Sequence, residues 1–139
     1  MRVIPSKIQL SSRGNAEVLD VTQQVAQAVA QSGLKDGTVT IFCPSSTSAL
    51  TTIEYEPGVV SDLHHLFDRL VPADIPYAHE EAWHDGNGHS HVRAALLGPS
   101  LTVPFTAQRL TLGTWQQIVY IDFDIRPRRR ELVLQIIGE

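Results

Sequence analysis

Four of the six histidines in this sequence fall within thirteen positions, in one polar stretch. They are His79, His84, His89 and His91. Neutral imidazole is a common ligand of Zn²⁺ and related divalent metals, and neighbouring acids such as Asp85 can bind the metal or orient an imidazole. The stretch therefore predicts a metal ligand or an acid–base role for at least one histidine. The alternative is a polar surface loop whose histidines have no function.

The geometry of His89 and His91 depends on the secondary structure that carries them. On a strand both side chains would point to the same side, whereas on the helix predicted here they diverge by about 200°. We therefore do not expect these two imidazoles to share one metal easily. His64 and His65 flank the apolar stripe of another predicted helix, and we interpret them as structural or solvent-facing.

A second feature is the run of hydroxyl residues from Ser45 to Ser48, at a break between two predicted strands. A turn of this kind can present hydroxyls, including those of Ser46 and Thr47, and backbone N–H groups to a phosphate. Serine and threonine are also common in ordinary turns, and no P-loop glycine–lysine pattern is present, so both interpretations stay open. Glu54 ends the second strand and must be solvated, paired or metal-bound, which makes it a candidate general base or metal partner.

The C-terminal third adds an indole and a group of arginines. Trp115, close to Gly113, could form a stacking wall for an aromatic ligand, or anchor the core or a subunit interface. Arg130 ends the only dense basic cluster, which begins at Arg126. Such a cluster is either a solvated turn or a receptor that binds phosphate bidentately.

The elements that must position these residues predict a single compact α+β domain, with a mixed or antiparallel sheet and a few covering helices. Three helices are expected, over 17–31 with Asp20 and Gln23 as a capping box and Gly33 as the stop, over 57–70, and over 89–97. Residues 72–88 are predicted to be a functional surface loop. Strands are expected over 3–10, 38–43, 49–54, 101–106, 117–124 and 131–137.

Composition limits the class of protein. The chain has 139 residues, a formal net charge of −4 and one cysteine, which fits one domain over 1–139 and excludes an internal disulfide. Its negative charge disfavours nucleic acid and anionic membranes as partners. No apolar run approaches the ~20 residues that span a bilayer, and no signal-peptide core is evident, so we expect a cytoplasmic protein.

Taken together, these residues resemble the YjbQ-like family over nearly the whole chain. The Leu-Leu-Gly-Pro-Ser-Leu segment at 96–101 and the Leu-Gly-Thr-Trp-Gln segment at 112–116 carry the resemblance most specifically. It is supported by 46–58, 62–63, 69–72, Tyr77 with His79, 87–91 and 138–139. One departure is Ser45, which stands where many relatives carry histidine.

The resemblance implies a homotrimer with a polar pocket near the subunit contacts and a secondary thiamine-phosphate synthase activity. That reaction joins hydroxymethylpyrimidine diphosphate to thiazole phosphate and releases diphosphate. Carried over by position, the pocket residues are Glu54, His79, Asn87, His91 and 113–116, which include Thr114, Trp115 and Gln116. We expect Glu54, Asn87 and His91 to be catalytic.

Two other functions stay open at this stage. One is a module that binds a metal or a phosphorylated metabolite without chemistry, because no nucleophile–base pair is evident. The other is a metal-dependent hydrolase that uses the histidine-rich stretch. In each case we expect a phosphorylated small molecule as partner and a divalent metal, Zn²⁺ or Mg²⁺, as cofactor.

Overall fold

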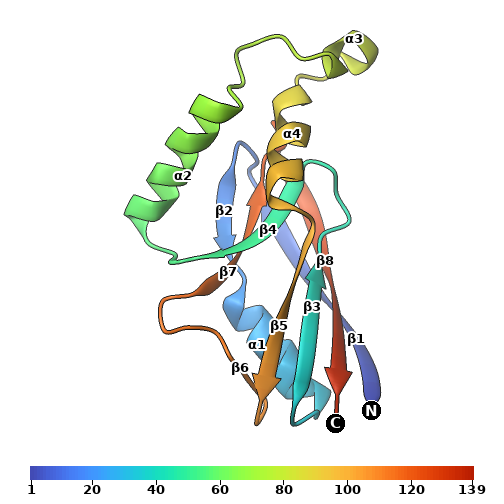
Figure 1. Cartoon of the computed structure of the whole chain (residues 1–139). Coiled ribbons are helices and arrows are strands. Elements are labelled where there is room, and N and C mark those ends of the chain that lie inside the picture. Colours follow the sequence, from blue (N-terminus) through green and yellow to red (C-terminus); the bar gives the residue numbers. More distant parts are fainter.

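The computed structural model describes all 139 residues and confirms the α+β class (Figure 1). Its larger sheet has the order β1-β8-β3-β5-β6 and its smaller sheet the order β2-β7-β4, with every neighbouring pair antiparallel. The larger sheet consists of β1 (Arg2–Ser12), β8 (Arg128–Gly138), β3 (Gly37–Phe42), β5 (Ser100–Thr106) and β6 (Arg109–Leu110). The smaller sheet consists of β2 (Glu17–Asp20), β7 (Gln117–Asp122) and β4 (Ser48–Ile53).

Two hydrophobic cores meet at β7, because this strand is buried on both faces. Ile118 and Tyr120 pack into the larger core, which also contains the inward residues of β3 and β8. Val119 and Ile121 point the other way, into a smaller core. The alternation predicted for β3 is confirmed, since Val39 and Ile41 are buried and Phe42 is exposed. A strand buried on both faces holds its last residue, Asp122, rigidly, and this residue belongs to the site described below.

Four helices complete the fold: α1 (Thr22–Ser32), α2 (Pro57–Leu70), α3 (His79–Trp83) and α4 (Gly88–Leu97). The larger core includes apolar residues of α1, and the smaller core includes Phe67 of α2 and Ala94 of α4. The predicted limits of α2 are confirmed, with Glu56 accepting hydrogen bonds from the first-turn N–H groups and Pro57 in the first turn. None of the helices combines the length and the apolar character needed to cross a membrane.

The sequence prediction placed the first helix boundary wrongly. Residues 17–20 pair with β7 as a strand, and the helix begins only at Thr22. Asp20 does not form a capping box with Gln23; its carboxylate instead accepts from the N–H and the hydroxyl of Thr22, at 3.0 and 2.6 Å. Pairing with the buried strand β7 overrides the local helical pattern. The five-residue helix α3 was likewise missed, inside the predicted loop.

Candidate functional site

The imidazoles of His79 and His91 lie against each other, with ring centroids 4.4 Å apart. Asp85 completes a cluster, because its Oδ1 lies 3.3 Å from His79 Nε2, without the alignment of a hydrogen bond. One ligand atom from each of the three residues can be chosen so that all lie within 4.8 Å of one another. The three residues come from the start of α3, the connection to α4 and the first turn of α4, which are consecutive in the chain.

The α3–α4 connection is folded around the carboxylate of Glu80. This carboxylate accepts hydrogen bonds from the N–H groups of Gly86 and Gly88, at 2.7 and 2.9 Å. These two bonds lower the pKa of Glu80. Asp85 in turn accepts from the N–H of Asn87 at 3.0 Å, and this bond, together with the nearby His79, lowers the pKa of Asp85. Both carboxylates are therefore held ionised while the turn is formed.

Two glycines and a tyrosine explain why the chain closes tightly here. Gly86 has φ +75°, a left-handed conformation that favours glycine. Gly88 packs on Tyr77, and a Cβ at this position would lie 2.5 Å from the tyrosine Cβ. The Tyr77 hydroxyl donates to the carbonyl of Pro72 at 2.6 Å, which fixes the ring. The predicted loop is thus an ordered turn that aligns His79, Asp85 and His91.

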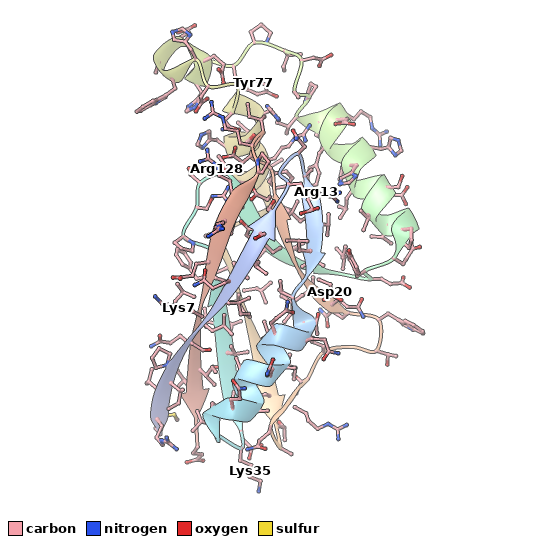
Figure 2. All side chains as sticks on the ribbon, turned by 180° about the vertical axis from the view of Figure 1, so that it is seen from behind. Lys7, Arg13, Asp20, Lys35, Tyr77 and Arg128 are labelled. Carbon is pink, nitrogen blue, oxygen red and sulfur yellow. The ribbon has the colours of Figure 1, made fainter.

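An open polar cavity of about 400 Å³ lies next to the cluster and has no hydrophobic residue in its lining. Asp85 and His91 form one part of its wall, and the hydroxyl turn from Ser45 to Thr47 forms another. Asn87, Asp124, Arg128 and Arg130 also line it. Figure 2 shows Arg128 toward the end of the molecule that carries Tyr77, with Lys35 at the opposite end. The cavity therefore joins the cluster on α3 and α4 to the start of β8.

Arg130 is held by acids at the end of β7. Its Nε and Nη2 donate to the two carboxylate oxygens of Asp122, at 2.8 and 2.9 Å, and Asp122 is fully buried. Nη2 also donates to the hydroxyl of Thr47 at 2.9 Å. A bidentate pair of this kind fixes the guanidinium plane, so the arginine anchors the hydroxyl turn.

Asp124 connects the turn to α4. Its carboxylate accepts from the Thr47 hydroxyl at 3.1 Å and from the Asn87 amide at 3.4 Å. Arg128 Nε lies 3.3 Å from the same carboxylate. Burial alone would raise the pKa of Asp124, but the hydrogen bonds from the Arg126 N–H, Asn87 and Thr47, with the charge of Arg128, outweigh it and lower the pKa. Asp124 is therefore an ionised link between the walls of the cavity.

A second cavity of about 300 Å³ continues from the first, because Ser45, Ser46 and His91 line both. Ala94, Ala95 and Pro99 add small apolar surfaces. The combined space thus has a polar part near the acids and arginines and a less polar part beside α4.

Of the four histidines predicted as metal ligands, the structure brings together His79 and His91 and leaves His84 and His89 apart from them. His84 ends α3 with a left-handed backbone and an exposed side chain. His89 is buried near Tyr77, with ring centroids 6.3 Å apart. Burial lowers its pKa, as does the positive charge of Arg93. The divergence of His89 and His91 on α4 follows from their helical spacing.

Glu54 and residues 113–116 do not line the polar cavity. Glu54 is exposed at the end of β4 remote from the hydroxyl turn, which precedes this strand (Figure 1). Within one chain, the expected meeting of Glu54 with the histidines therefore does not occur, because β4 separates them. Asn87, in contrast, is buried and lines the cavity as expected for a site residue.

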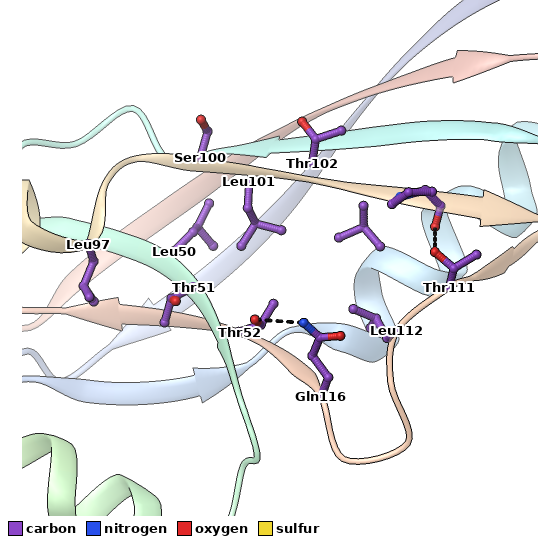
Figure 3. A pocket seen from close by; sticks show the side chains of 12 residues that line it. Leu50, Thr51, Thr52, Leu97, Ser100, Leu101, Thr102, Thr111, Leu112 and Gln116 are labelled. Carbon is purple, nitrogen blue, oxygen red and sulfur yellow. Dashed lines mark hydrogen bonds between the residues drawn. The ribbon is translucent and has the colours of Figure 1, made fainter.

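Gln116 belongs to a different cavity, between β4 and β5, of about 390 Å³ (Figure 3). Its amide donates to the Thr52 hydroxyl at 3.1 Å, and its own side-chain oxygen accepts from the N–H of Gly113. Trp115 is 71% exposed, and neither it nor Thr114 lines this cavity. Trp115 therefore stacks on nothing within this chain.

Sequence reasoning missed Asp122, Asp124 and Arg128 as site residues. The available signal was the Asp-x-Asp pattern at the end of an otherwise apolar strand, followed by arginines. Acids that end a buried strand need charged partners, and Arg128 and Arg130 are the nearest cations in sequence.

The donor set of the cluster fits a divalent transition metal. Two imidazoles and one carboxylate are a common ligand set of catalytic zinc and non-haem iron sites, which keep open positions. His79 Nε2 is a buried atom without a hydrogen-bond partner, and a metal would satisfy it. The part of the cofactor prediction that concerns a His/Asp metal cluster is thus supported by this geometry.

The fold and this cluster define a class of small α+β proteins with one polar site beside a short helix. A family model described as UPF0047 protein YjbQ-like matches residues 6–139, so the chain belongs to this family. A UPF0047 protein of Methanothermobacter thermautotrophicus is 34% identical over all of this chain and 95% of its own length. YugU of Bacillus subtilis is 32% identical over 94% of this chain and 97% of its own.

A solved structure from Sulfolobus solfataricus superimposes with a TM-score of 0.93 and 31% identity, over 99% of both chains. It is described as a YbjQ-like protein of unknown function. The curated relatives above are named only as UPF0047 proteins. The thiamine-phosphate synthase activity expected from the resemblance is therefore wrong as an assignment, since neither the structure's description nor the relatives' names carry that activity.

Proposed function

We propose that this protein binds a divalent transition metal through His79, Asp85 and His91 and uses the adjoining cavity to bind a small anionic molecule. The observation that carries the proposal is the convergence of three ligand atoms within 4.8 Å, at the edge of a cavity with no hydrophobic lining. Three protein ligands leave coordination positions for water or a ligand. The cavity gives such a ligand access.

The donors favour zinc, and cobalt as its laboratory substitute, over magnesium. Magnesium prefers an octahedral shell of oxygen atoms and seldom uses imidazole, whereas imidazole suits zinc, copper, iron and nickel. Two of the three donors here are imidazoles. A bound zinc ion would supply a Lewis acid and two positive charges to the cavity.

Each protein residue has a separable role in this proposal. His79 and His91 bind the metal through nitrogen, and Asp85 binds it through oxygen. The carboxylate of Glu80 positions the turn that carries Asp85, through its bonds to Gly86 and Gly88. Asn87 and Asp124 hold the opposite wall, and Arg128 supplies positive charge to the cavity.

Isothermal titration of metal-free protein with Zn²⁺ and Co²⁺ tests the proposal. The wild type is expected to bind one ion per chain, and Mg²⁺ is expected to bind far more weakly. His79→Ala and His91→Ala should each weaken binding by at least about tenfold, because each removes one of only three ligands.

His84→Ala is the matched control, since His84 lies in the same segment but outside the cluster. It should leave the affinity unchanged. Equal losses from His84→Ala and His91→Ala, or no binding by the folded wild type, would refute the proposed metal centre.

A further inference from the structure

We infer that the cavity binds a small organic phosphate monoester, and that it does so strongly only when the metal site is filled. The inference rests on the proposed function and adds the class of ligand and the order of binding. Three observations carry it: the balance of charge around the cavity, the orientation of the donors in the hydroxyl turn, and the less polar second cavity beside α4.

The charge balance makes anion binding depend on the metal. Asp85, Asp124, Arg128 and Arg130 line the cavity, and Asp122 lies directly behind Arg130. Three carboxylates thus face two guanidinium groups, which leaves one negative charge in excess. A divalent cation reverses the excess to one positive charge. Because the interaction of a phosphate with the site changes sign, the apo cavity repels it and the metal-loaded cavity attracts it.

The hydroxyl turn supplies hydrogen-bond donors to the cavity. The Thr47 hydroxyl is engaged with Asp124 and Arg130. Neither the hydroxyl nor the N–H of Ser46 is engaged within the chain, and Ser46 lines both cavities. Phosphate oxygens accept from such donors readily. Ser46 is therefore the residue of this turn that is free to bind an oxyanion.

Arg128 is the cation that this site can use. Arg130 is bound bidentately by the buried Asp122, whereas Arg128 is 43% exposed on its side chain and makes a single contact with Asp124. An exposed guanidinium with one loose partner can rotate to form charge-assisted bonds with a phosphate. Arg130 instead keeps the turn in place.

The second cavity sets the size and character of the organic group. It shares Ser45, Ser46 and His91 with the polar cavity and adds Ala94, Ala95 and Pro99. A phosphate bound between the metal and Ser46 would direct its ester substituent toward these apolar surfaces. A free phosphate would leave them unused, which favours a monoester.

The experiment compares inorganic phosphate and phenyl phosphate as probes, in metal-free and Co²⁺-loaded protein, by ³¹P NMR titration. Co²⁺ loading should lower the Kd of both probes at least about tenfold, within the usual range of coupling between two ligands. Paramagnetic broadening by Co²⁺ should show that the phosphorus atom lies near the metal.

Matched variants assign the residues. Arg128→Gln should weaken both probes about tenfold, as loss of a charge-assisted hydrogen bond does. Arg129→Gln is the control, because this exposed neighbour does not line the cavity. Ala95→Phe, at an exposed helix position, should weaken phenyl phosphate and spare inorganic phosphate.

The outcomes separate the two proposals. If the wild type binds no Co²⁺, the proposed function fails. If it binds Co²⁺ but the Kd of phosphate is the same with and without the metal, this inference alone is overturned. Equal effects of Arg128→Gln and Arg129→Gln would also overturn it.

Discussion

The carboxylate of Glu80 and the N–H of Gly88 are joined by a hydrogen bond of 2.9 Å, which ties the start of α3 to the start of α4. His79 precedes Glu80, and His91 lies one turn into the helix that Gly88 begins. The bond therefore sets the separation of the two imidazoles. Residues that orient metal ligands in this way affect affinity without touching the metal.

Replacement of Glu80 by glutamine tests this relationship. A glutamine presents one acceptor oxygen to the two N–H groups of Gly86 and Gly88, and its amide group repels the other. Co²⁺ affinity should fall by about tenfold, at the lower limit for such supporting residues. The visible spectrum of bound Co²⁺ should shift, because the ligand geometry changes.

Glu81→Gln is the control for Glu80→Gln, since Glu81 is adjacent, acidic and exposed. Its Co²⁺ affinity and spectrum should match those of the wild type. An unchanged spectrum and affinity in Glu80→Gln would show that the turn is held by other contacts.

The stability of the metal-free protein should depend on pH through His89. Burial and Arg93 lower its pKa in the folded state, whereas an unfolded histidine has a pKa of about 6.5. The unfolded chain therefore binds the proton more tightly. The resulting stability is fully present above about pH 6.5 and is lost as the pH falls through the lowered folded pKa.

Urea denaturation at about pH 7.5 and about pH 5.5 measures this loss, with His89→Phe as the comparison. The phenylalanine variant should lose less stability between the two conditions than the wild type. His65→Phe, at an exposed position on α2, should behave like the wild type. Identical pH dependence in all three proteins would show that His89 is not the titrating group.

The pair of Asp122 and Arg130 should be essential to stability. Asp122 is fully buried and the side chain of Arg130 is 15% exposed, so Asp122→Asn leaves a buried cation without its charged partner. We expect a loss of about 3 kcal/mol in the free energy of unfolding, typical of breaking one side of a buried ion pair. Chemical denaturation monitored by circular dichroism measures it.

Asp62→Asn is the control for this experiment, because Asp62 is exposed on α2. It should change the free energy of unfolding by less than about 0.5 kcal/mol. A loss in Asp122→Asn as small as that in Asp62→Asn would mean that the pair contributes no net stability.

The homotrimer implied by the family resemblance stays a prediction. The chain exposes large apolar side chains at Val92 and Leu96 of α4 and at Trp115. Their burial between copies would be favourable. Light scattering after size-exclusion chromatography should give three times the chain mass of 15.4 kDa; the mass of one chain would exclude the trimer under those conditions.

Most of the fold could be predicted from the sequence because its strands alternate and its helices have clear ends. Pro57 and the apolar spacing set α2, and Gly98 marks the end of α4. The strand Glu17–Asp20 could not be predicted, because its partner β7 lies a hundred residues away and local pattern favours a helix there. Long-range pairing of this kind leaves no local signal.

The candidate site could be predicted only in part. The histidine-rich segment was visible, but which imidazoles meet depends on the turn that Glu80 closes, and this turn rests on two specific backbone hydrogen bonds. Asp124 and Arg128 reach the site through sheet pairing of distant segments. Glu54 and Trp115 were placed there by resemblance alone, and the single chain does not bring them to the cavity.

The most direct test of the central claim is the crystal structure of Zn²⁺-loaded protein, with anomalous differences measured across the zinc absorption edge. The proposal predicts one peak per chain, at about 2.0–2.2 Å from a nitrogen of His79, a nitrogen of His91 and an oxygen of Asp85. A peak bound by other residues, or a fully folded protein with no peak between these three, would contradict it.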